Sequence, residues 1–588
     1  LSFVLYRLFS FFRKSEIFLS NNMAGPDIGD GTSPLTNQNC DVLVVGAGIS
    51  GLSSAREILK ADPSLKVLII EGKNRVGGRT HTVELKASGG ESEKWDIGGQ
   101  WVGKTQIHIL DLVKELNLET YDQYTQGAKW MQIGSAKPRK YTSSLPKAEE
   151  IGQFSVFEVL DFLKSYTKIK NLIASTDVKD FLSSPDAKEH DSITVKEWFQ
   201  KHAYTRFFVD VADMITKTVF GVPAARMSFL YFLVYIKSGG NLDDVLESTN
   251  TGAQAIKIAG GTQQISQKLS DVIGKDKIYL NQALLKLRFL DENDDESPVE
   301  AVIQNTLDET KITKVIAKRV ILAISPSECS RIRFQSGLPF GKKQLFDGAP
   351  QGNLFKFLVT YEKPFWREKG FSGEILSTGF TDNPRETRPL NSVFDATTKS
   401  GKPALVGFIN NETWSDSSPE VRKLAVLEDL ARFLGDEALK PLDYIDKDWH
   451  QEMFTGGCPV SVVPAGNMGA YTRAREPWKT IHFAGTETAT IWIGYMSGAV
   501  QAGLRAGHEV LLKLGNKNVN WNYLVRLIFN CLFLFISVQE DSFLNPQYKP
   551  QLEWDNRYKK DSTVISVKSL FLIAVVIGVA YFVKSRIF

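Results

Sequence analysis

The pattern of hydrophobic positions becomes regular at residue 41, where the first clear structural elements begin. Residues 42–45 are continuously apolar, which is typical of a strand buried on both faces of a parallel sheet. A glycine-containing turn and a helical pattern follow as far as residue 61. A second apolar run, KVLIIE, ends at Glu71 and predicts the next parallel strand. The folded part of the chain therefore opens with a strand–turn–helix–strand unit.

Helical and strand patterns then alternate along most of the remaining chain. Helical periodicity covers residues 107–118, most of 186–275, 418–435 and 497–514. Strand patterns cover residues 277–290, 301–305, 318–325, 352–362, 404–410 and 481–487. This order predicts an α/β fold in which a nucleotide-binding domain of Rossmann type is interleaved with a mixed α+β domain. The first domain is expected to use segments 39–120, 250–330 and 450–512, and the second 121–249 and 331–449.

The two ends of the chain differ from this folded body. Residues 1–38 are expected to be a disordered lead-in. Within them, residues 1–22 resemble a poor signal peptide, and are better explained as an artefact that precedes a natural start at Met23. Residues 513–563 read as a polar linker, except for the apolar run 524–538, which is either an interfacial helix or a translated intron.

A second apolar run lies close to the C-terminus. Residues 570–583 contain no charge, and extension back to Val564 gives 20 residues with Lys568 as the one interruption. A helix of that length would reach ~30 Å, the thickness of a bilayer core. We therefore expect a transmembrane helix over residues 564–585.

Composition excludes several classes of protein. The 588 residues contain 70 Lys and Arg against 67 Asp and Glu, a net charge of +3, which does not favour nucleic-acid binding. Four cysteines in a chain of this length make no disulfide framework. No His and Cys residues have zinc-ligand spacing, so no metal site is expected.

A dinucleotide-binding motif lies between the first strand and the first helix. Gly46, Gly48 and Gly51 form GxGxxG, in which the three glycines allow a tight turn, close approach of a pyrophosphate and close helix packing. Glu71 ends the next strand 20 residues after Gly51, where an acid can bind ribose hydroxyls. An acid at this position disfavours the 2′-phosphate of NADP.

Further motifs concern the same ligand. The segment 71–80, EGKNRVGGRT, places a glycine pair beside arginines, with Arg79 as the expected charge partner of a diphosphate. A second glycine-rich block follows at 95–103. Residues 482–503 read as a strand, a glycine turn and a helix, so a second helix N-terminus is expected near the ligand.

Together these motifs resemble the flavin-dependent amine oxidases, and within them the monoamine oxidases. The resemblance covers residues 41–512, about four-fifths of the chain. The blocks that carry it are DVLVVGAGISGL, EGKNRVGGRT, DIGGQWVG, LYFLVYIKSGG, IAGGTQQISQKL, FKFLVTYEKPFW, GGC and FAGTETATIWIGYMSGAVQAG.

The resemblance implies FAD as the cofactor, attached through a thioether to Cys458 of the GGC block. The alternative is a small buried cysteine, the commoner fate of a lone Cys. It also implies that Lys356 holds a water near the flavin, rather than extending to solvent from a strand edge. The cofactor contacts that it implies are Gly46, Gly48, Ser50, Gly51, Glu71, Gly72, Arg79, Gly98, Leu284, Cys458, Thr486, Glu487 and Met496.

The expected substrate pocket departs from the family pattern at one position. Tyr495 matches one of two tyrosines that face each other before the flavin, whereas Pro459 stands where the second is expected. This change predicts a pocket of different shape. Trp101 and Trp492 are candidates for its aromatic surface, although a tryptophan is more often simply part of the core.

The resemblance implies oxidative deamination of primary or secondary amines, with oxygen as the electron acceptor and aldehyde, ammonia and hydrogen peroxide as products. It further implies a homodimer anchored in the outer mitochondrial membrane by its C-terminal helix, with the catalytic body facing the cytosol. Three alternatives remain: a polyamine oxidase, a non-catalytic membrane-tethered flavoprotein and an NAD-dependent dehydrogenase. No nucleic-acid partner is expected.

Overall fold

The computed structural model describes residues 34–134, 136–142, 155–248, 252–380, 387–410 and 414–515. All of them belong to the first of two units, Leu1–Trp521 and Asn522–Phe588. Among these residues, no helix combines the length and the apolar character needed to cross a membrane. The expected transmembrane segment 564–585, the linker beyond residue 515 and the lead-in before residue 34 all lie outside the described residues.

The first sheet has eight strands in the order β10-β2-β1-β13-β12-β11-β14, with β20 paired to β13. The central strand β1 is parallel to both neighbours, and Val45 aligns with Ile70 and Leu322. Their carboxyl ends therefore share one edge of the sheet. The strands are β1 (Gln38–Val45), β2 (Val67–Ile70), β10 (Ile278–Tyr279), β11 (Gln282–Phe289), β12 (Val299–Asn305), β13 (Ile312–Leu322), β14 (Arg333–Phe334) and β20 (Ile481–Phe483).

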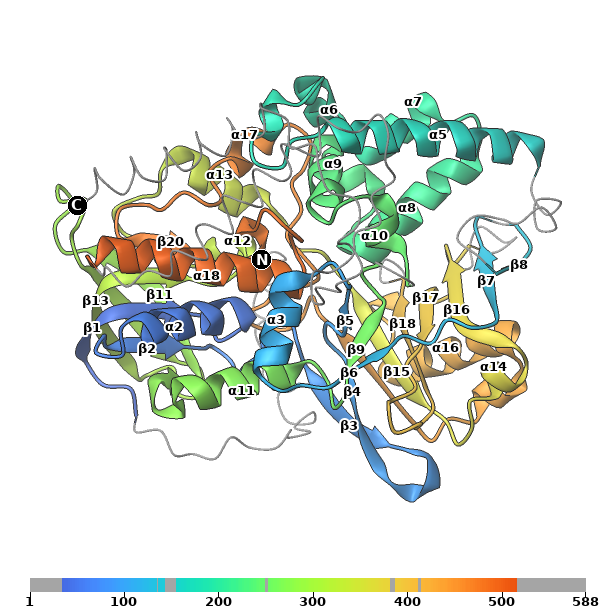
Figure 1. Ribbon diagram of the computed structural model, residues 1–588, viewed down its shortest axis with the longest axis horizontal. Helices are drawn as coiled ribbons and strands as arrows, with labels where there is room; N and C mark the ends of the chain where they lie inside the picture. Colours follow the sequence, from blue (N-terminus) through green and yellow to red (C-terminus); the bar gives the residue numbers. More distant parts are fainter. Residues whose placement is uncertain are drawn as a thin grey trace, which may run out of the picture. The chain divides into compact units, whose positions relative to one another are not determined.

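Helices α2 (Ile49–Ala61) and α18 (Met496–Lys513) pack against each other beside this sheet (Figure 1). A Cβ at Gly503 would lie 2.3 Å from the Ser50 carbonyl oxygen, and His508 Nε2 lies 3.0 Å from Glu57 Oε1. The residue numbers of the contacts rise together, so the two helices are parallel. Helices α11 (Gln263–Ile273) and α3 (Ile107–Glu115) pack against α2 and α18, respectively.

The second sheet has seven strands in the order β19-β15-β18-β17-β16-β7-β8. It is antiparallel except for the pair β7–β16. Helix α16 (Pro419–Leu434) packs on it, and α14 (Phe365–Glu368) precedes β16. The strands are β7 (Ala128–Gln132), β8 (Arg139–Tyr141), β15 (Phe355–Thr360), β16 (Phe371–Ser377), β17 (Leu390–Asp395), β18 (Ala404–Ile409) and β19 (Asp443–Asp448).

Helix α9 (Phe229–Ser238) is buried along almost its whole length. One hydrophobic core joins Tyr235 of this helix to Leu43 of β1. The sequence between residues 187 and 246 is largely helical, as predicted, and helix also covers residues 156–175. The other helices are α5 (Val156–Ser175), α6 (Ala187–Ser192), α7 (Val195–His202), α8 (Arg206–Phe220), α10 (Leu242–Leu246), α12 (Pro326–Cys329), α13 (Phe340–Gly348) and α17 (Met468–Tyr471).

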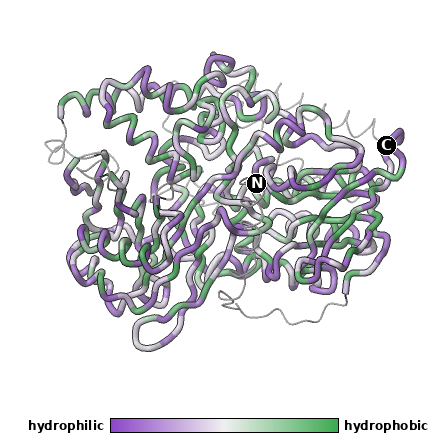
Figure 2. Tube along the Cα trace, turned by 180° about the vertical axis from the view of Figure 1, so that it is seen from behind, coloured by the Kyte–Doolittle hydropathy of each residue, from purple (hydrophilic) through white to green (hydrophobic). Residues whose placement is uncertain are grey.

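A short segment links the two sheets. The hairpin β3 (Thr82–Lys86) and β4 (Ser92–Asp96) follows β2 of the first sheet in sequence, yet Leu85 and Trp95 pack with Leu358 and Val406 of the second sheet. The turn of this hairpin is mostly pale in Figure 2, which marks residues of intermediate hydropathy. Residues 97–102 then lie between the sheets. They end in β5 (Trp101–Val102), which pairs with β9 (Ile256–Ile258) beside β6 (Thr120–Asp122).

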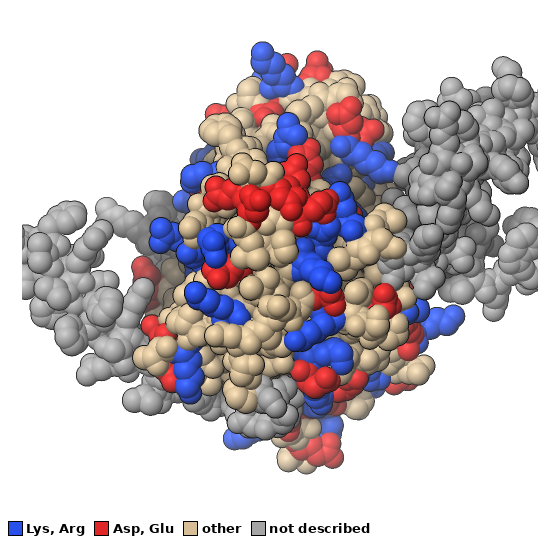
Figure 3. Space-filling view, turned by 90° about the vertical axis from the view of Figure 1, so that its left-hand side faces the viewer, with Lys and Arg blue, Asp and Glu red and all other residues tan. Residues whose placement is uncertain are grey.

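The described residues therefore form an α/β fold, as the sequence predicts. Strand β9 lies in a stretch that the sequence pattern assigned mainly to helix, and the pattern did not reveal β16, β17 or β19. The face shown in Figure 3 carries acidic and basic side chains close together, in line with the small net charge.

Candidate active site

The glycine turn after β1 leaves an open space beside Gly48. Gly46 has φ +102°, and a Cβ there would lie 2.9 Å from the Ala323 oxygen. A Cβ at Gly51 would lie 2.0 Å from the Gly46 oxygen. At Gly48, in contrast, the nearest atom to an added Cβ is the Cα of Gly78 at 4.0 Å. Two glycines are thus required by the fold, whereas the third keeps a space that a pyrophosphate can approach.

Glu71 lies at the carboxyl edge of the sheet, directly beside this turn. Its Oε2 accepts a hydrogen bond of 2.8 Å from the Ala47 N–H, and its Oε1 accepts one of 3.1 Å from the Lys73 N–H. Its neighbour Gly72 packs so closely that a Cβ would lie 2.6 Å from the ring of Phe454. The Glu71 carboxylate is therefore held at the position where this motif places the acid that binds the ribose hydroxyls.

The second glycine pair packs directly on the first turn. The Gly77 N–H donates to the Ala47 oxygen at 2.9 Å, and Gly48 pairs with Gly77 as an isolated bridge. The next residue, Arg79, forms a bidentate ion pair with Glu487, at 2.7 and 3.1 Å. Both residues were predicted to contact the cofactor, but the pair itself was not predicted. The carboxylate of Glu487, which is 1% exposed, compensates the charge that Arg79 offers to a diphosphate.

The N-terminus of α18 faces the same side as that of α2, because the helices are parallel. Tyr495 is its N-cap residue and Met496 its first residue. Thr486 Oγ1 donates to the Tyr495 oxygen at 2.9 Å, and the Ser50 hydroxyl donates to the Ala484 oxygen. Neither α2 nor α18 has a side-chain hydrogen bond at its N-cap. The first backbone N–H groups at the N-terminus of each helix can therefore bind an anion.

Leu284 lies in β11, the strand that begins beside Glu71. The N–H of Gln282, the first residue of that strand, donates to the Glu71 backbone oxygen at 2.8 Å, and Leu284 packs against the core as a partly buried side chain.

Lys356 projects from the central part of the second sheet toward the linking segment. Its side chain is 3% exposed, and Nζ donates to the Gly98 oxygen and to Gln100 Oε1, both at 2.7 Å. Nζ also lies 5.5 Å from the centre of the Trp101 ring. Burial lowers the pKa of Lys356 to about 7, while the charge of Asp96 acts in the opposite direction. The lysine is thus internal, as expected, and its pKa lies close to neutral pH.

Cys458 lies in the segment after β19, close to Arg79 and Lys356. Its N–H donates to the Gly352 oxygen at 2.9 Å, just before the start of β15. Burial raises the pKa of its thiol to about 12, and the nearby cations of Arg79 and Lys356 oppose that shift. It is a free cysteine and is partly exposed, whereas Cys40 and Cys329 are buried. The three residues Arg79, Lys356 and Cys458 are therefore brought together from distant parts of the sequence.

Aromatic side chains surround Tyr495. Its ring packs edge-on to Trp492, with centroids 4.8 Å apart, and lies 5.9 Å from the ring of Tyr235. Trp492 is only 2% exposed, so it supports Tyr495 from the core. Trp101 is partly exposed, and its Nε1 donates to Gln123 Oε1 at 3.0 Å. Pro459 offers its oxygen to Arg79 at 2.7 Å.

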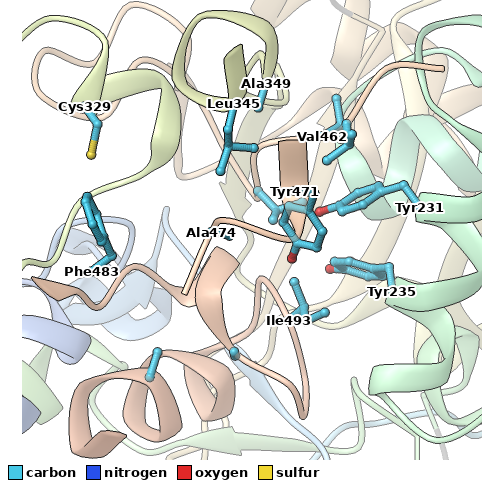
Figure 4. Close-up of a cluster of buried hydrophobic side chains, with 14 of the residues drawn as sticks. Tyr231, Tyr235, Cys329, Leu345, Ala349, Val462, Tyr471, Ala474, Phe483 and Ile493 are labelled. Atoms are coloured by element: carbon cyan, nitrogen blue, oxygen red, sulfur yellow. The ribbon is translucent and has the colours of Figure 1, made fainter. Parts of the chain in front are cut away.

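Tyr235 was not predicted as a site residue, although it lies within the quoted block LYFLVYIKSGG. Figure 4 shows Tyr231 and Tyr235 projecting from α9 toward Tyr471 and Ile493. Burial keeps the phenol of Tyr235 neutral by raising its pKa well above the usual value, and its hydroxyl interacts with that of Tyr495.

A partly buried charge cluster fixes the segment that precedes Cys458. Glu452 accepts ion pairs from Lys73 at 3.0 Å, Arg75 at 2.8 Å and Lys447 at 2.7 Å. Lys73 also donates to the Thr455 hydroxyl. This cluster joins the segment after Glu71 to strand β19 of the second sheet. Within the described ranges, no group of His, Cys, Asp and Glu could hold a metal ion.

Comparison with known proteins gives one consistent result. The family model described as flavin containing amine oxidoreductase matches residues 49–511. A probable flavin-containing monoamine oxidase A of Dictyostelium discoideum is 31% identical over 492 residues, which cover 82% of this chain and 99% of that protein. The flavin-containing amine oxidase B of Homo sapiens is 33% identical over 485 residues, covering 82% and 87%.

Solved structures with the same fold act on different amines. Cyclohexylamine oxidase from Brevibacterium oxydans superposes with a TM-score of 0.71 at 28% identity, covering 81% of this chain and 99% of that one. A putrescine oxidase bound to putrescine superposes with a TM-score of 0.69 at 27% identity, covering 81% and 99%.

Proposed function

The chain belongs to the family of flavin-containing amine oxidoreductases, and we propose that within this family it deaminates monoamines with an FAD attached to Cys458. Its membership makes it an FAD-dependent amine oxidase. The proposal that Cys458 carries the FAD rests on one observation: Cys458, Lys356 and Arg79 lie close together, although they are far apart in the sequence. FAD, when bound, supplies the two-electron redox chemistry, with oxygen as the final acceptor.

The residues present fit a dinucleotide. The space beside Gly48 and the free N–H groups of α2 and α18 would hold the diphosphate, and Glu71 the ribose. Tyr495, supported by Trp492 and Tyr235, forms an aromatic wall for the amine. An apolar wall of this kind excludes water and favours the neutral amine, whose lone pair is needed for oxidation. Pro459 removes one aromatic side chain and leaves room for a bulkier substrate.

The covalent attachment can be tested by denaturing the purified protein. We expect flavin fluorescence to remain with the polypeptide in wild type and in Cys329→Ala, and to be lost from it in Cys458→Ala. Flavin that is released from denatured wild type would refute the covalent attachment.

The substrate class can be tested by peroxide release with benzylamine, tyramine, putrescine and spermine. We expect the aromatic monoamines to be oxidised fastest, because an aromatic wall packs favourably against the aromatic group of the substrate. The alternative is a polyamine-type oxidase, in keeping with the similarity to a putrescine oxidase. Rapid spermine oxidation with no tyramine oxidation would establish that alternative. Absence of peroxide with every amine, despite bound FAD, would favour a non-catalytic flavoprotein.

We also propose that residues 564–585 anchor a homodimer in the outer mitochondrial membrane, with its catalytic body in the cytosol. The support is the apolar composition of the segment, its flanking Lys and Arg residues and the resemblance to monoamine oxidases. In cell fractions, the full chain should resist carbonate extraction, whereas a chain that ends at residue 515 should be released. Release of both would refute the anchor, and a monomer mass for the detergent-purified full chain would refute the dimer.

A further inference from the structure

The side-chain amide of Gln100 is buried with its two ends in different situations. Its Oε1 accepts a hydrogen bond of 2.7 Å from Lys356 Nζ. Its Nε2 is enclosed and finds no hydrogen-bond partner among the described residues. A lysine ammonium can only donate, so this bond fixes the orientation of the amide, with the oxygen toward Lys356 and the nitrogen away from it. The residue is 5% exposed, so the amide is shielded from bulk solvent.

This arrangement is not what fold stability alone would favour. A buried amide N–H without a partner destabilises the folded protein, whereas an apolar side chain of similar size would not. The oxygen of the same amide, however, makes a short bond to the internal lysine. The destabilisation caused by the unpartnered Nε2 of Gln100 therefore goes together with the hydrogen bond that its Oε1 accepts from Lys356.

Lys356 has two neighbours that fix the direction of its three N–H groups. One is the Gly98 oxygen, a backbone atom in a turn so tight that a Cβ on Gly98 would lie 2.6 Å from the Arg79 oxygen. The other is Gln100. With two N–H groups engaged, the third has a defined direction and remains for a ligand. Without Gln100, Nζ would be held at a single point and could rotate about it.

We propose that Gln100 is a positioning residue for amine oxidation, which acts by holding Lys356 Nζ in one orientation toward the bound flavin. The proposal rests on the proposed function, because it assigns Lys356 to the flavin side of the site. Gln100 need not touch the substrate. Its effect passes through Lys356, and this dependence makes the proposal testable.

The charges around Lys356 predict how substitutions at Gln100 should act. Asp96, at the end of β4, favours the protonated lysine, and so would a Cys458 thiolate; Lys257 of β9 opposes it. Lys447, its partner in β19, is already paired with Glu452. The Gln100 oxygen also favours the protonated form, because it accepts a hydrogen bond from it. Gln100→Met should therefore lower the pKa of Lys356, and Gln100→Glu should raise it.

The experiment compares flavin reduction by a monoamine under anaerobic conditions with a pH titration of the flavin absorbance without amine. Gln100→Met should slow reduction by about 10-fold, equivalent to the loss of one hydrogen bond to a charged group. Its absorbance transition should shift to lower pH, and that of Gln100→Glu to higher pH. Lys356→Met should abolish the transition. Gln344→Met makes the same chemical change at an exposed site and should leave both measurements unchanged.

A double-mutant cycle separates positioning from a merely structural role. In the Lys356→Met background, Gln100→Met should have no further effect on flavin reduction, because its target is absent. Independent, multiplying effects of the two substitutions would overturn the proposal, and so would wild-type behaviour of Gln100→Met. If Gln100→Met fails to fold, Gln100→Glu retains the acceptor and still tests the opposite shift. If wild type does not react with monoamines, the proposed function fails, while the titration without amine still tests the positioning of Lys356.

Discussion

At the scale of single residues, the glycines of the first turn differ in what surrounds them. Gly48 has φ −79° and open space where a Cβ would lie, whereas a Cβ at Gly51 would overlap the Gly46 oxygen. We expect Gly48→Ala to fold normally and to bind FAD at least about 10-fold more weakly, because the methyl group occupies the space for the pyrophosphate. Gly51→Ala should lower the thermal midpoint itself. Thermal unfolding and FAD content distinguish the two; full FAD content in Gly48→Ala would contradict this interpretation.

Lys356 predicts a particular dependence of stability on pH. Its pKa falls from 10.5 in the unfolded chain to about 7 in the folded protein, chiefly because burial disfavours the charge. Between these values the unfolded state binds more protons, so the contribution of Lys356 to stability rises with pH, by up to ~1.4 kcal/mol per unit. Lys356→Met should therefore be most stabilised relative to wild type at pH 7 and below, and this difference should shrink toward pH 10.

The measurement is the thermal midpoint of both proteins from pH 6 to pH 10. Lys343→Met, at an exposed lysine, serves as the control and should show no such trend. A difference between wild type and Lys356→Met that stays constant over this range would show that Lys356 remains charged in the folded protein, as it is in the unfolded chain.

The residues that the sequence predicted and those that it missed differ in a physical way. The glycine turn and Glu71 lie within one strand–turn–helix–strand unit, so local spacing reveals them. Gln100 becomes informative only because Lys356, more than 250 residues later, donates to it. Glu452 likewise appears as an unremarkable acidic residue until the fold places three cations around it. Partners that are distant in sequence leave no periodic signal.

At the scale of elements, the parallel pair α2 and α18 depends on glycine at the contact. A Cβ at Gly503 would lie 2.3 Å from the Ser50 oxygen, within the turn that is expected to bind the cofactor. Alanine normally stabilises a helix relative to glycine by about 1 kcal/mol. We expect Gly503→Ala to lose more than this gain, with a net destabilisation of about 1–3 kcal/mol and weaker FAD binding.

Gly469→Ala is the matched control, because that glycine also lies in a helix but has no atom within 4 Å of an added Cβ. Chemical denaturation of the two variants and wild type gives the comparison. Equal stability of Gly503→Ala and wild type would mean that α2 and α18 can move apart without loss of folding free energy.

The predicted strands were those whose burial is evident from the residues themselves. Residues 42–45 of β1 are continuously apolar and all four are buried, which is typical of a strand covered on both faces. Strand β19, DYIDKD, is half-buried throughout and mostly polar, and it forms a strand because β15 offers a complete edge for pairing. Strand β9 has only three residues and pairs with β5 and β6. Such strands are determined by their neighbours, so their own sequences do not predict them.

At the scale of the whole described unit, the Glu452 cluster joins the two sheets. Lys73 and Arg75 follow β2 of the first sheet, and Lys447 belongs to β19 of the second. Glu452→Gln would leave one buried and two partly buried cations without their carboxylate, so we expect a loss of about 3 kcal/mol in the free energy of unfolding. The measurement is chemical denaturation. Glu437→Gln, at an exposed ion pair, should change stability by less than about 1 kcal/mol.

A loss of stability in Glu452→Gln no larger than that of Glu437→Gln would show that solvent reaches the cluster and screens its charges. A reduced yield of covalent flavin in the same variant would connect the cluster to Cys458, six residues further along the chain.

The placement of Lys356 and Glu71 on different sheets has a mechanical consequence. In the proposed arrangement, a flavin bound beside Glu71 and facing Lys356 would span the junction between the two sheets. Slippage of one sheet against the other, even by a fraction of an ångström, would alter the electric field at the bound chromophore. The absorption spectrum of the bound flavin should therefore depend on how rigidly the two sheets are held together.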